Sequence, residues 1–263
     1  MIDKQMHFNI GFFRCGNTLL RSIINQNPNF HMTPNSLTAE IFYRIDLIKM
    51  TDIFKELSDY EALRRIMKQL FNLYYADKNQ KYIIEQGPWG TPDNFELLRY
   101  NNFYPNCKFI CLIRPLKEII ASWVKQDEPK DIDNYVNQMM GEYGRVGNTM
   151  VSLDNLMLKS PTGVKFIHYE DLCEKPKEVL KAIHEYLEIP NFEYKLENLD
   201  QPGSDSELAK FGKQITIRTD KISKVEYDYD KYCPPRILQR YGTVDEAIKR
   251  YCVKARSQFT TAK

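Results

Sequence analysis

The sequence lacks several patterns that assign a chain to a common protein class. Its four histidines lie scattered at positions 7, 31, 168 and 184, without His-x-x-x-His or calcium-loop spacing, so we expect no metal site. None of its eleven glycines precedes Lys-Ser or Lys-Thr, and no Gly-x-Gly-x-x-Gly run occurs. The sequence therefore contains neither a Walker A loop nor a dinucleotide-binding turn.

Paired cysteines and a strong net charge are also missing. The six cysteines form no Cys-x-x-Cys pair and no regular framework, so we expect reduced thiols in a cytoplasmic protein. The start of the chain does not resemble a signal peptide, and no apolar run reaches transmembrane length. The net charge of +2 argues against broad nucleic-acid binding, although it leaves room for a local basic pocket.

The apolar patterns that are present predict a three-layer α/β fold with a central, mostly parallel sheet. Phe8, Ile10 and Phe12 alternate as in a strand, and the apolar run 109–113 is typical of a central strand covered on both faces. We expect one domain over residues 1–263. Further strands are predicted at 30–33, 82–85 and 164–168, helices at 19–24, 37–76, 94–101, 116–124, 176–187 and from 243, and a long loop over 198–235.

A candidate anion site follows the first strand. The turn carries Arg14 and Gly16, and the next helix starts on Asn17 and Thr18, which are suited to cap it. Unpaired N–H groups and the helix dipole favour an anion at such a helix start. We expect a phosphorylated or sulfated ligand near Arg14; a capped helix beside a surface arginine is the alternative.

A second candidate anion site, separate from the first, lies at the end of the central strand. Arg114 ends that strand, Pro115 suits the first turn of the following helix, and Ser122 lies eight residues after Arg114. Ligands of open α/β sheets bind at this edge. A structural ion pair at Arg114 and a surface role for Ser122 remain the alternative.

Together the two segments resemble the sulfotransferase family, whose donor is 3′-phosphoadenosine 5′-phosphosulfate (PAPS). Residues 13–20, Phe-Arg-Cys-Gly-Asn-Thr-Leu-Leu, are similar to the family loop for the 5′-phosphosulfate, and Arg114 and Ser122 match its 3′-phosphate segment. Residues 169–172, Tyr-Glu-Asp-Leu, resemble the segment whose Tyr lies by the adenine. Weaker similarities cover residues 27–34, the segment around Trp89, and 217–222.

The resemblance implies an enzyme that moves a sulfuryl group from PAPS to a hydroxyl or amine, without a metal. Phe13 and Cys15 replace Pro and Ser of the family loop, which removes one hydroxyl donor. Arg14 would stabilise the charge that develops on the bridging oxygen. The implied donor-binding residues are Arg14, Cys15, Gly16, Asn17, Thr18, Leu19, Arg114, Ser122, Tyr169, Arg218, Thr219 and Lys221.

The general base and the acceptor are less well defined by sequence. The position of the glutamate base in tyrosylprotein-type members holds Asn35, so we take Glu85 as first candidate, Glu40 as second and His31 as third. Helical segments 37–80 and 125–160 are expected to select a small-molecule, lipid or carbohydrate acceptor. A P-loop-like nucleotide kinase and a catalytically inactive nucleotide-binding module of the same fold are the alternatives, and the oligomeric state is unknown.

Overall fold

The sheet has five strands, all parallel, in the order β2-β3-β1-β4-β5. The computed structural model of the chain describes residues 4–33, 36–57, 59–87, 104, 106–159, 164–199 and 221–260. The order places β1 at the centre of the sheet, with β3 on one side and β4 on the other. The strands are β1 (Gln5–Gly11), β2 (Phe30–Met32), β3 (Tyr82–Gln86), β4 (Phe109–Ile113) and β5 (Val164–His168).

Strand β4 is buried along its whole length, because neighbouring strands pair with both of its edges and helices cover both faces. Its five residues are all apolar, as a doubly covered parallel strand requires. Strand β1 contributes Phe8. Its ring contacts Phe109 of β4 at a centroid distance of 5.5 Å, and Phe71 in the helices between β2 and β3 at 5.7 Å. The core therefore extends from the middle of the sheet into the helices between β2 and β3.

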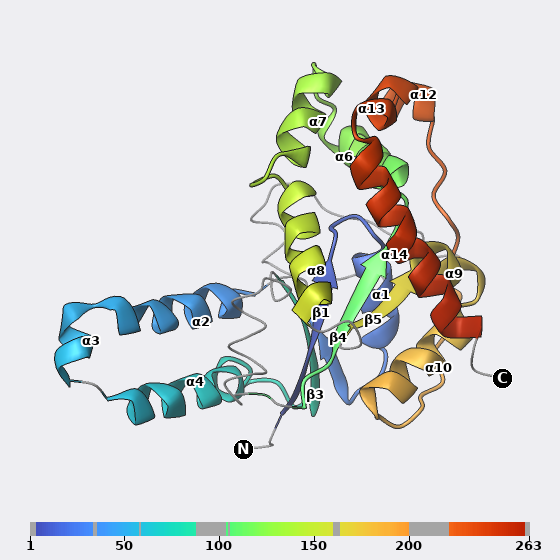
Figure 1. Cartoon of the computed structure of the whole chain (residues 1–263). Coiled ribbons are helices and arrows are strands. Elements are labelled where there is room, and N and C mark those ends of the chain that lie inside the picture. Colours follow the sequence, from blue (N-terminus) through green and yellow to red (C-terminus); the bar gives the residue numbers. More distant parts are fainter. Residues whose placement is uncertain are drawn as a thin grey trace.

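Helices cover both sides of the sheet (Figure 1). Helix α8 packs on β1, and α14 packs on β4 and β5, whereas α1 lies on the other side and contacts β2. This division follows from right-handed crossovers that leave the central strands in opposite directions. Helix α1 spans Asn17–Ile24. The described helices that follow β4 are α6 (Leu116–Asp127), α7 (Ile132–Met140), α8 (Gly147–Lys159), α9 (Tyr169–Glu174), α10 (Pro176–Leu187), α12 (Tyr229–Tyr232), α13 (Pro235–Arg240) and α14 (Gly242–Thr260).

The segment between β2 and β3 forms a helical arm that extends to one side of the sheet (Figure 1). The sequence predicts helix over 37–76, and the structure divides it into α2 (Thr38–Leu47), η1 (Ile48–Met50), α3 (Asp52–Leu57) and α4 (Tyr60–Tyr74). Thr51 interrupts the run with extended backbone, and Asp59 restarts it by accepting from the N–H of Ala62 at 3.0 Å.

The predicted strands and most predicted helices are confirmed. The long loop predicted over 198–235 is wrong at its end, because α12 lies within it and α13 begins at Pro235. The loop signal came from Pro and Gly, yet proline is favoured in the first turn of a helix, where Pro235 stands. The helix predicted at 94–101 lies outside the described residues.

His7 is a buried ionisable group in the middle of β1. The residue is fully buried, and neither ring nitrogen has a hydrogen-bond partner among the described residues. Burial, with a smaller contribution from the positive charge of Lys108, lowers the pKa of His7 from 6.5 to about 4. The histidine is therefore neutral in the folded protein at pH values where an unfolded chain would protonate it.

This difference predicts a pH-dependent loss of stability. Between pH 6.5 and 4 the unfolded chain binds the His7 proton and the folded chain does not, so the free energy of unfolding falls as the pH falls. A His7→Leu variant lacks this contribution. Chemical denaturation from pH 7 to pH 4 should show the wild type losing about 3 kcal/mol more than the variant. Equal losses in the two proteins would contradict the buried, neutral assignment.

Candidate functional site

The loop between β1 and α1 has a backbone conformation that few residue types adopt readily. Arg14 and Gly16 both have positive φ, at 68° and 94°. A Cβ at Gly16 would lie 2.5 Å from a ring carbon of Tyr169, so no side chain fits there without a shift. Glycine at 16 is therefore required both by φ and by the close approach of Tyr169.

The start of α1 presents backbone N–H groups rather than a side-chain cap. Gly16 is the N-cap and makes no capping hydrogen bond, and the first helical bond runs from Leu20 N to Gly16 O at 3.0 Å. The expectation that Asn17 caps the helix is wrong, because its amide donates to Phe12 O at 3.1 Å and accepts from Asn9 at 3.0 Å. The N–H groups of residues 17–19 are those that an α-helix leaves without intrahelical partners, as an anion site requires.

Cys15 of the loop and Leu19 of α1 both point away from solvent. Cys15 is completely buried, and burial raises the pKa of its thiol well above the ordinary value. The thiol is therefore neutral and unreactive at physiological pH. Leu19 packs in the core, whereas Thr18 is half-buried. Cys15 and Leu19 can thus serve a ligand through their backbone N–H groups and not through their side chains.

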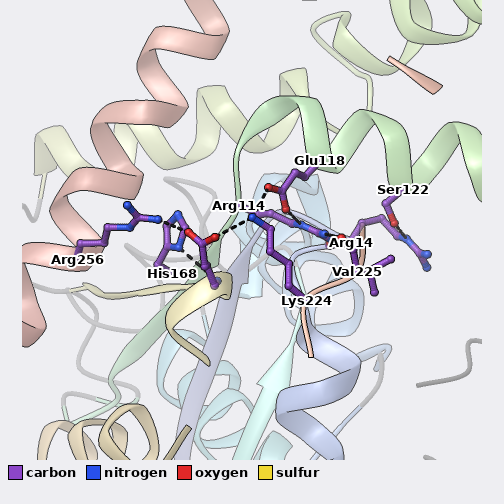
Figure 2. A network of polar contacts seen from close by, with 9 residues as sticks. Arg14, Arg114, Glu118, Ser122, His168, Lys224, Val225 and Arg256 are labelled. Atoms are coloured by element: carbon purple, nitrogen blue, oxygen red, sulfur yellow. Dashed lines mark hydrogen bonds and ion pairs between the residues drawn. The ribbon is translucent and has the colours of Figure 1, made fainter. Parts of the chain in front are cut away.

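Arg114 is a buried cation at the end of β4, and Figure 2 shows the polar network around it. Its Nε donates to Glu118 Oε2 at 2.7 Å, and its Nη1 donates to Arg14 O at 3.3 Å. The other oxygen of Glu118 pairs with Lys224 Nζ at 3.2 Å. Glu118 is thus shared between two cations, Arg114 and Lys224, that lie 110 positions apart in the sequence.

Lys224 connects this network to helix α9. Its Nζ lies 2.8 Å from Glu170 Oε1, and Arg256 of α14 pairs with the other oxygen of Glu170 (Figure 2). The hydrogen bond from Lys224 lowers the pKa of Glu170 and keeps it ionised. Partial burial acts to lower the pKa of Lys224, yet the contacts with Glu170 and Glu118 raise it above the ordinary value. Both groups are therefore charged over the physiological pH range.

The two candidate anion sites touch each other. Arg14 Nε donates to Ser122 Oγ at 2.9 Å, so the two predicted sites adjoin each other (Figure 2). Burial lowers the pKa of Arg14, but an arginine remains protonated at any physiological pH. Ser122 is itself buried. The structure therefore places Arg14, Arg114 and Ser122 in one cationic cluster.

Aromatic rings lie against the cations of this cluster. The guanidinium of Arg114 lies 4.2 Å from the ring centre of Tyr169 and 5.3 Å from that of Tyr227. Arg14 lies 5.7 Å from the ring centre of Trp123. Flat rings beside cations stabilise the positive charge and offer stacking surfaces. Such a site suits a ligand that combines phosphate groups with a planar ring.

A cavity of about 340 Å³ opens beside the cluster, at the carboxyl ends of β1 and β3. One wall is formed by strand ends and the loop, and the other by α8 and the turn before it, within the segment 125–160 expected to select the acceptor. Its size is at the lower end of the range for small-molecule sites. The described lining residues are Asn9, Ile10, Gly11, Phe13, Asn17, Gln86, Gly87, Tyr143, Gly144, Arg145, Asn148, Thr149, Ser152 and Leu153.

Glu85, the first candidate base, is fully buried and is not among these lining residues, although Gln86 and Gly87 are. Its Oε1 accepts from Ser36 Oγ at 2.6 Å, from Tyr75 OH at 2.5 Å and from Thr38 Oγ1. Alternating strand residues point to opposite faces, so Glu85 lies towards the helical arm while Gln86 lies towards the cavity. Direct proton transfer from an acceptor requires this hydroxyl network to open.

The remaining candidates lie apart from the cluster or outside the described residues. Glu40 is exposed on α2 and pairs with Arg44 at 2.6 Å. His31 is half-buried in β2, and its ring lies edge-on to Tyr75 at a centroid distance of 6.0 Å. Lys221 is exposed and forms an isolated β-bridge with Glu197. Arg218, Thr219, Asn35 and Trp89 are not among the described residues.

The described residues contain neither a metal-binding group of side chains nor a membrane-spanning helix. Among the described residues, no three His, Cys, Asp or Glu side chains converge in a way that would hold a metal ion. No helix in the described part of the chain combines the length and apolar character needed to cross a bilayer. All six cysteines are free thiols and buried.

Comparisons with known proteins agree on one family. The family model for the sulfotransferase domain matches residues 7–202. A curated Caenorhabditis briggsae protein named "Putative protein-tyrosine sulfotransferase" is 22% identical over 213 residues, which are 78% of this chain and 73% of that protein.

Solved structures show the same fold at low sequence identity. The sulfotransferase domain of the Synechococcus PCC 7002 olefin synthase has a TM-score of 0.58 and 18% identity, with 95% of this chain and 96% of that chain covered. Mouse sulfotransferase SULT7A1, complexed with PAP, has a TM-score of 0.52 and 15% identity, with 95% and 90% covered.

Sequence reasoning missed three residues of the site. Glu118 stands four positions after Arg114, a spacing that brings opposite charges together on a helix and could have been noticed. Trp123 lies within the helix predicted at 116–124, and nothing in the sequence pairs it with Arg14. Arg145 carries no local motif, and its place in the cavity depends on the packing of α8 against β1.

Because Glu118 pairs with two cations, we predict that neutralising it lowers the free energy of unfolding substantially. A Glu118→Gln variant leaves the buried Arg114 without its carboxylate and Lys224 with Glu170 as its remaining partner, which should cost about 3 kcal/mol of unfolding free energy. Equilibrium denaturation measures this loss. Glu40→Gln is the matched control, because Glu40 pairs with Arg44 on the exposed face of α2, and it should change stability little. Similar small losses in both variants would contradict the assigned role.

Proposed function

Because the chain belongs to the sulfotransferase domain family, we propose that it transfers a sulfuryl group from PAPS to a hydroxyl or amine. The observation that carries the donor assignment is the cationic cluster. Arg14 and the start of α1 provide one anion site, Arg114 and Ser122 provide another, and the Arg14–Ser122 hydrogen bond of 2.9 Å joins them. A ligand with two separated phosphate groups matches this arrangement.

In the proposed complex, the 5′-phosphosulfate binds the loop and the first turn of α1. The backbone N–H groups of Cys15, Gly16, Asn17, Thr18 and Leu19 surround it. Arg114 and Ser122 bind the 3′-phosphate, and Tyr169 lies by the adenine. Arg218, Thr219 and Lys221 are proposed to complete the donor site. Support comes from the buried charge of Arg114 and from its contact with the Tyr169 ring.

The reaction proposed for this site needs no redox step. The bond between sulfur and the bridging oxygen of the 5′-phosphate breaks, and a bond from the acceptor oxygen or nitrogen to sulfur forms. The acceptor loses one proton, and the leaving phosphate takes the electron pair. Arg14 and the positive end of α1 stabilise the charge that grows on the bridging oxygen. This charge is larger in the transition state than in the bound donor, so the contact accelerates transfer.

We retain Glu85 as the first candidate for the base, followed by Glu40 and His31. The support for Glu85 is its place at the carboxyl end of β3, immediately before the cavity-lining Gln86 and Gly87. The hydroxyl groups on its Oε1 would have to separate for it to act. The acceptor is proposed to be a small molecule, a lipid or a carbohydrate that enters the cavity beside α8.

We also propose that residues 1–263 form a single domain in the cytoplasm. The support for the compartment is that all six cysteines are free, as is usual where thiols are kept reduced. The support for one domain is that the cluster draws on β1, β4, α6, α9 and the segment around Lys224 together. No nucleic-acid partner is proposed.

Titration calorimetry tests the donor assignment. The protein should bind adenosine 3′,5′-bisphosphate more tightly than adenosine 5′-monophosphate, because the second lacks the group that Arg114 and Ser122 are proposed to hold. Ser122→Ala should reduce this preference about tenfold, the cost of losing one hydrogen bond to a charged group. Binding of ATP–Mg²⁺ without binding of the bisphosphate would refute the proposal in favour of a nucleotide kinase.

Ser152→Ala is the matched control for this titration. Ser152 lines the cavity from α8 and has no contact with the cationic cluster in the proposed donor complex, so its loss should leave the bisphosphate preference intact. A second assay follows transfer from PAPS to a mixed acceptor library. Tight bisphosphate binding without transfer to any acceptor would favour the inactive nucleotide-binding module.

A further inference from the structure

Arg145 is the one charged side chain among the described residues that line the cavity. It stands in the turn before α8, and Asn148, Thr149 and Ser152 continue the same wall along the helix. Their spacing of three and four residues places these polar groups on one helix face. Opposite them, the strand ends and the start of α1 contribute the neutral amides Asn9, Asn17 and Gln86, while most of the exposed lining surface is apolar.

The guanidinium of Arg145 is held in place by an aromatic ring. It lies 4.2 Å from the ring centre of Trp123 and donates to Asp127 Oδ2 at 3.4 Å. That carboxylate oxygen has a stronger contact with Tyr135 OH, at 2.6 Å. The ion pair with Asp127 engages one N–H group of Arg145, whose side chain is half exposed, and a guanidinium carries five N–H donors in a planar fork suited to a carboxylate or phosphate.

Trp123 also links Arg145 to the donor side. Its ring lies near Arg14 as well, at 5.7 Å. One indole therefore supports an arginine of the proposed sulfuryl site and the arginine of the cavity. An anion held by Arg145 would lie close to the sulfuryl group, so a hydroxyl on the same small molecule could reach it.

We propose that the acceptor is a small hydroxyl compound with an anionic group, and that Arg145 binds this group as the specificity-determining residue. This inference rests on the proposed function and deepens it. A cationic acceptor would find no carboxylate among the described lining residues, and burying its charge without a partner is unfavourable. The cavity volume of about 340 Å³ limits the acceptor to a compact molecule.

Matched pairs of probes separate charge from shape. Glucuronate and glucuronamide form one pair, and 4-hydroxybenzoate and 4-hydroxybenzamide form the other. Each probe is titrated into the whole protein saturated with adenosine 3′,5′-bisphosphate, which keeps anions out of the donor site. The carboxylate of at least one pair should bind about tenfold more tightly than its amide, the usual gain from a charged hydrogen bond.

Arg145 variants show whether this preference comes from the proposed contact. Arg145→Gln should abolish the carboxylate preference, and Arg145→Lys should restore part of it, because charge remains without the planar fork. Arg236→Gln, which removes an exposed arginine paired with Asp133 on α7, is the matched control and should keep the preference.

Two results would overturn the inference: no tighter carboxylate binding in either pair, or the same preference in Arg145→Gln as in the wild type. The first titration step, bisphosphate binding to the wild type, distinguishes these failures from a failure of the proposed function. If the bisphosphate itself does not bind, the donor assignment is wrong; if it binds and the probes do not discriminate, only the acceptor inference is wrong.

Discussion

The buried ion pair between Arg114 and Glu118 is the interaction on which the rest of the site depends. Both side chains are almost completely removed from water, so neither charge is tolerable without the other. Through its remaining donors Arg114 reaches the backbone of the Arg14 loop, and through its second oxygen Glu118 holds Lys224. One pair at the end of a central strand thereby fixes segments from three distant parts of the sequence.

The same arrangement explains how the proposed donor site meets the cavity. Arg14 contacts Ser122 on α6, and the next residue, Trp123, lies between Arg14 and Arg145 at the cavity. Helix α6 therefore carries the polar contact for one site and the aromatic support for both. Its position is set by β4, which is buried on both faces and cannot shift without disturbing the core. Because the sheet holds α6 in place, the distance between Arg14 and Arg145 is fixed as well.

The fold was predictable from sequence because its strands are short, apolar and separated by clear helical patterns. Residues of the candidate site were predictable only where a short sequence pattern marks them. These residues are the loop at Arg14, and Arg114 with Ser122 eight residues later. The contact between Arg14 and Ser122 joins residues 108 positions apart and has no local pattern. The burial of Glu85 among hydroxyl groups likewise depends on how the helical arm packs on β3, which strand periodicity alone does not reveal.

A crystal structure with bound adenosine 3′,5′-bisphosphate would show whether the cationic cluster holds both phosphates. We predict one phosphate on the backbone N–H groups of residues 15–19 and the other within hydrogen-bond distance of Arg114 and Ser122. We also predict that the Arg114–Glu118 ion pair persists in the complex, because Glu118 holds the Arg114 side chain in place. A bisphosphate with neither phosphate on Arg114, or a complex in which Glu118 has moved away from Arg114, would contradict these assignments.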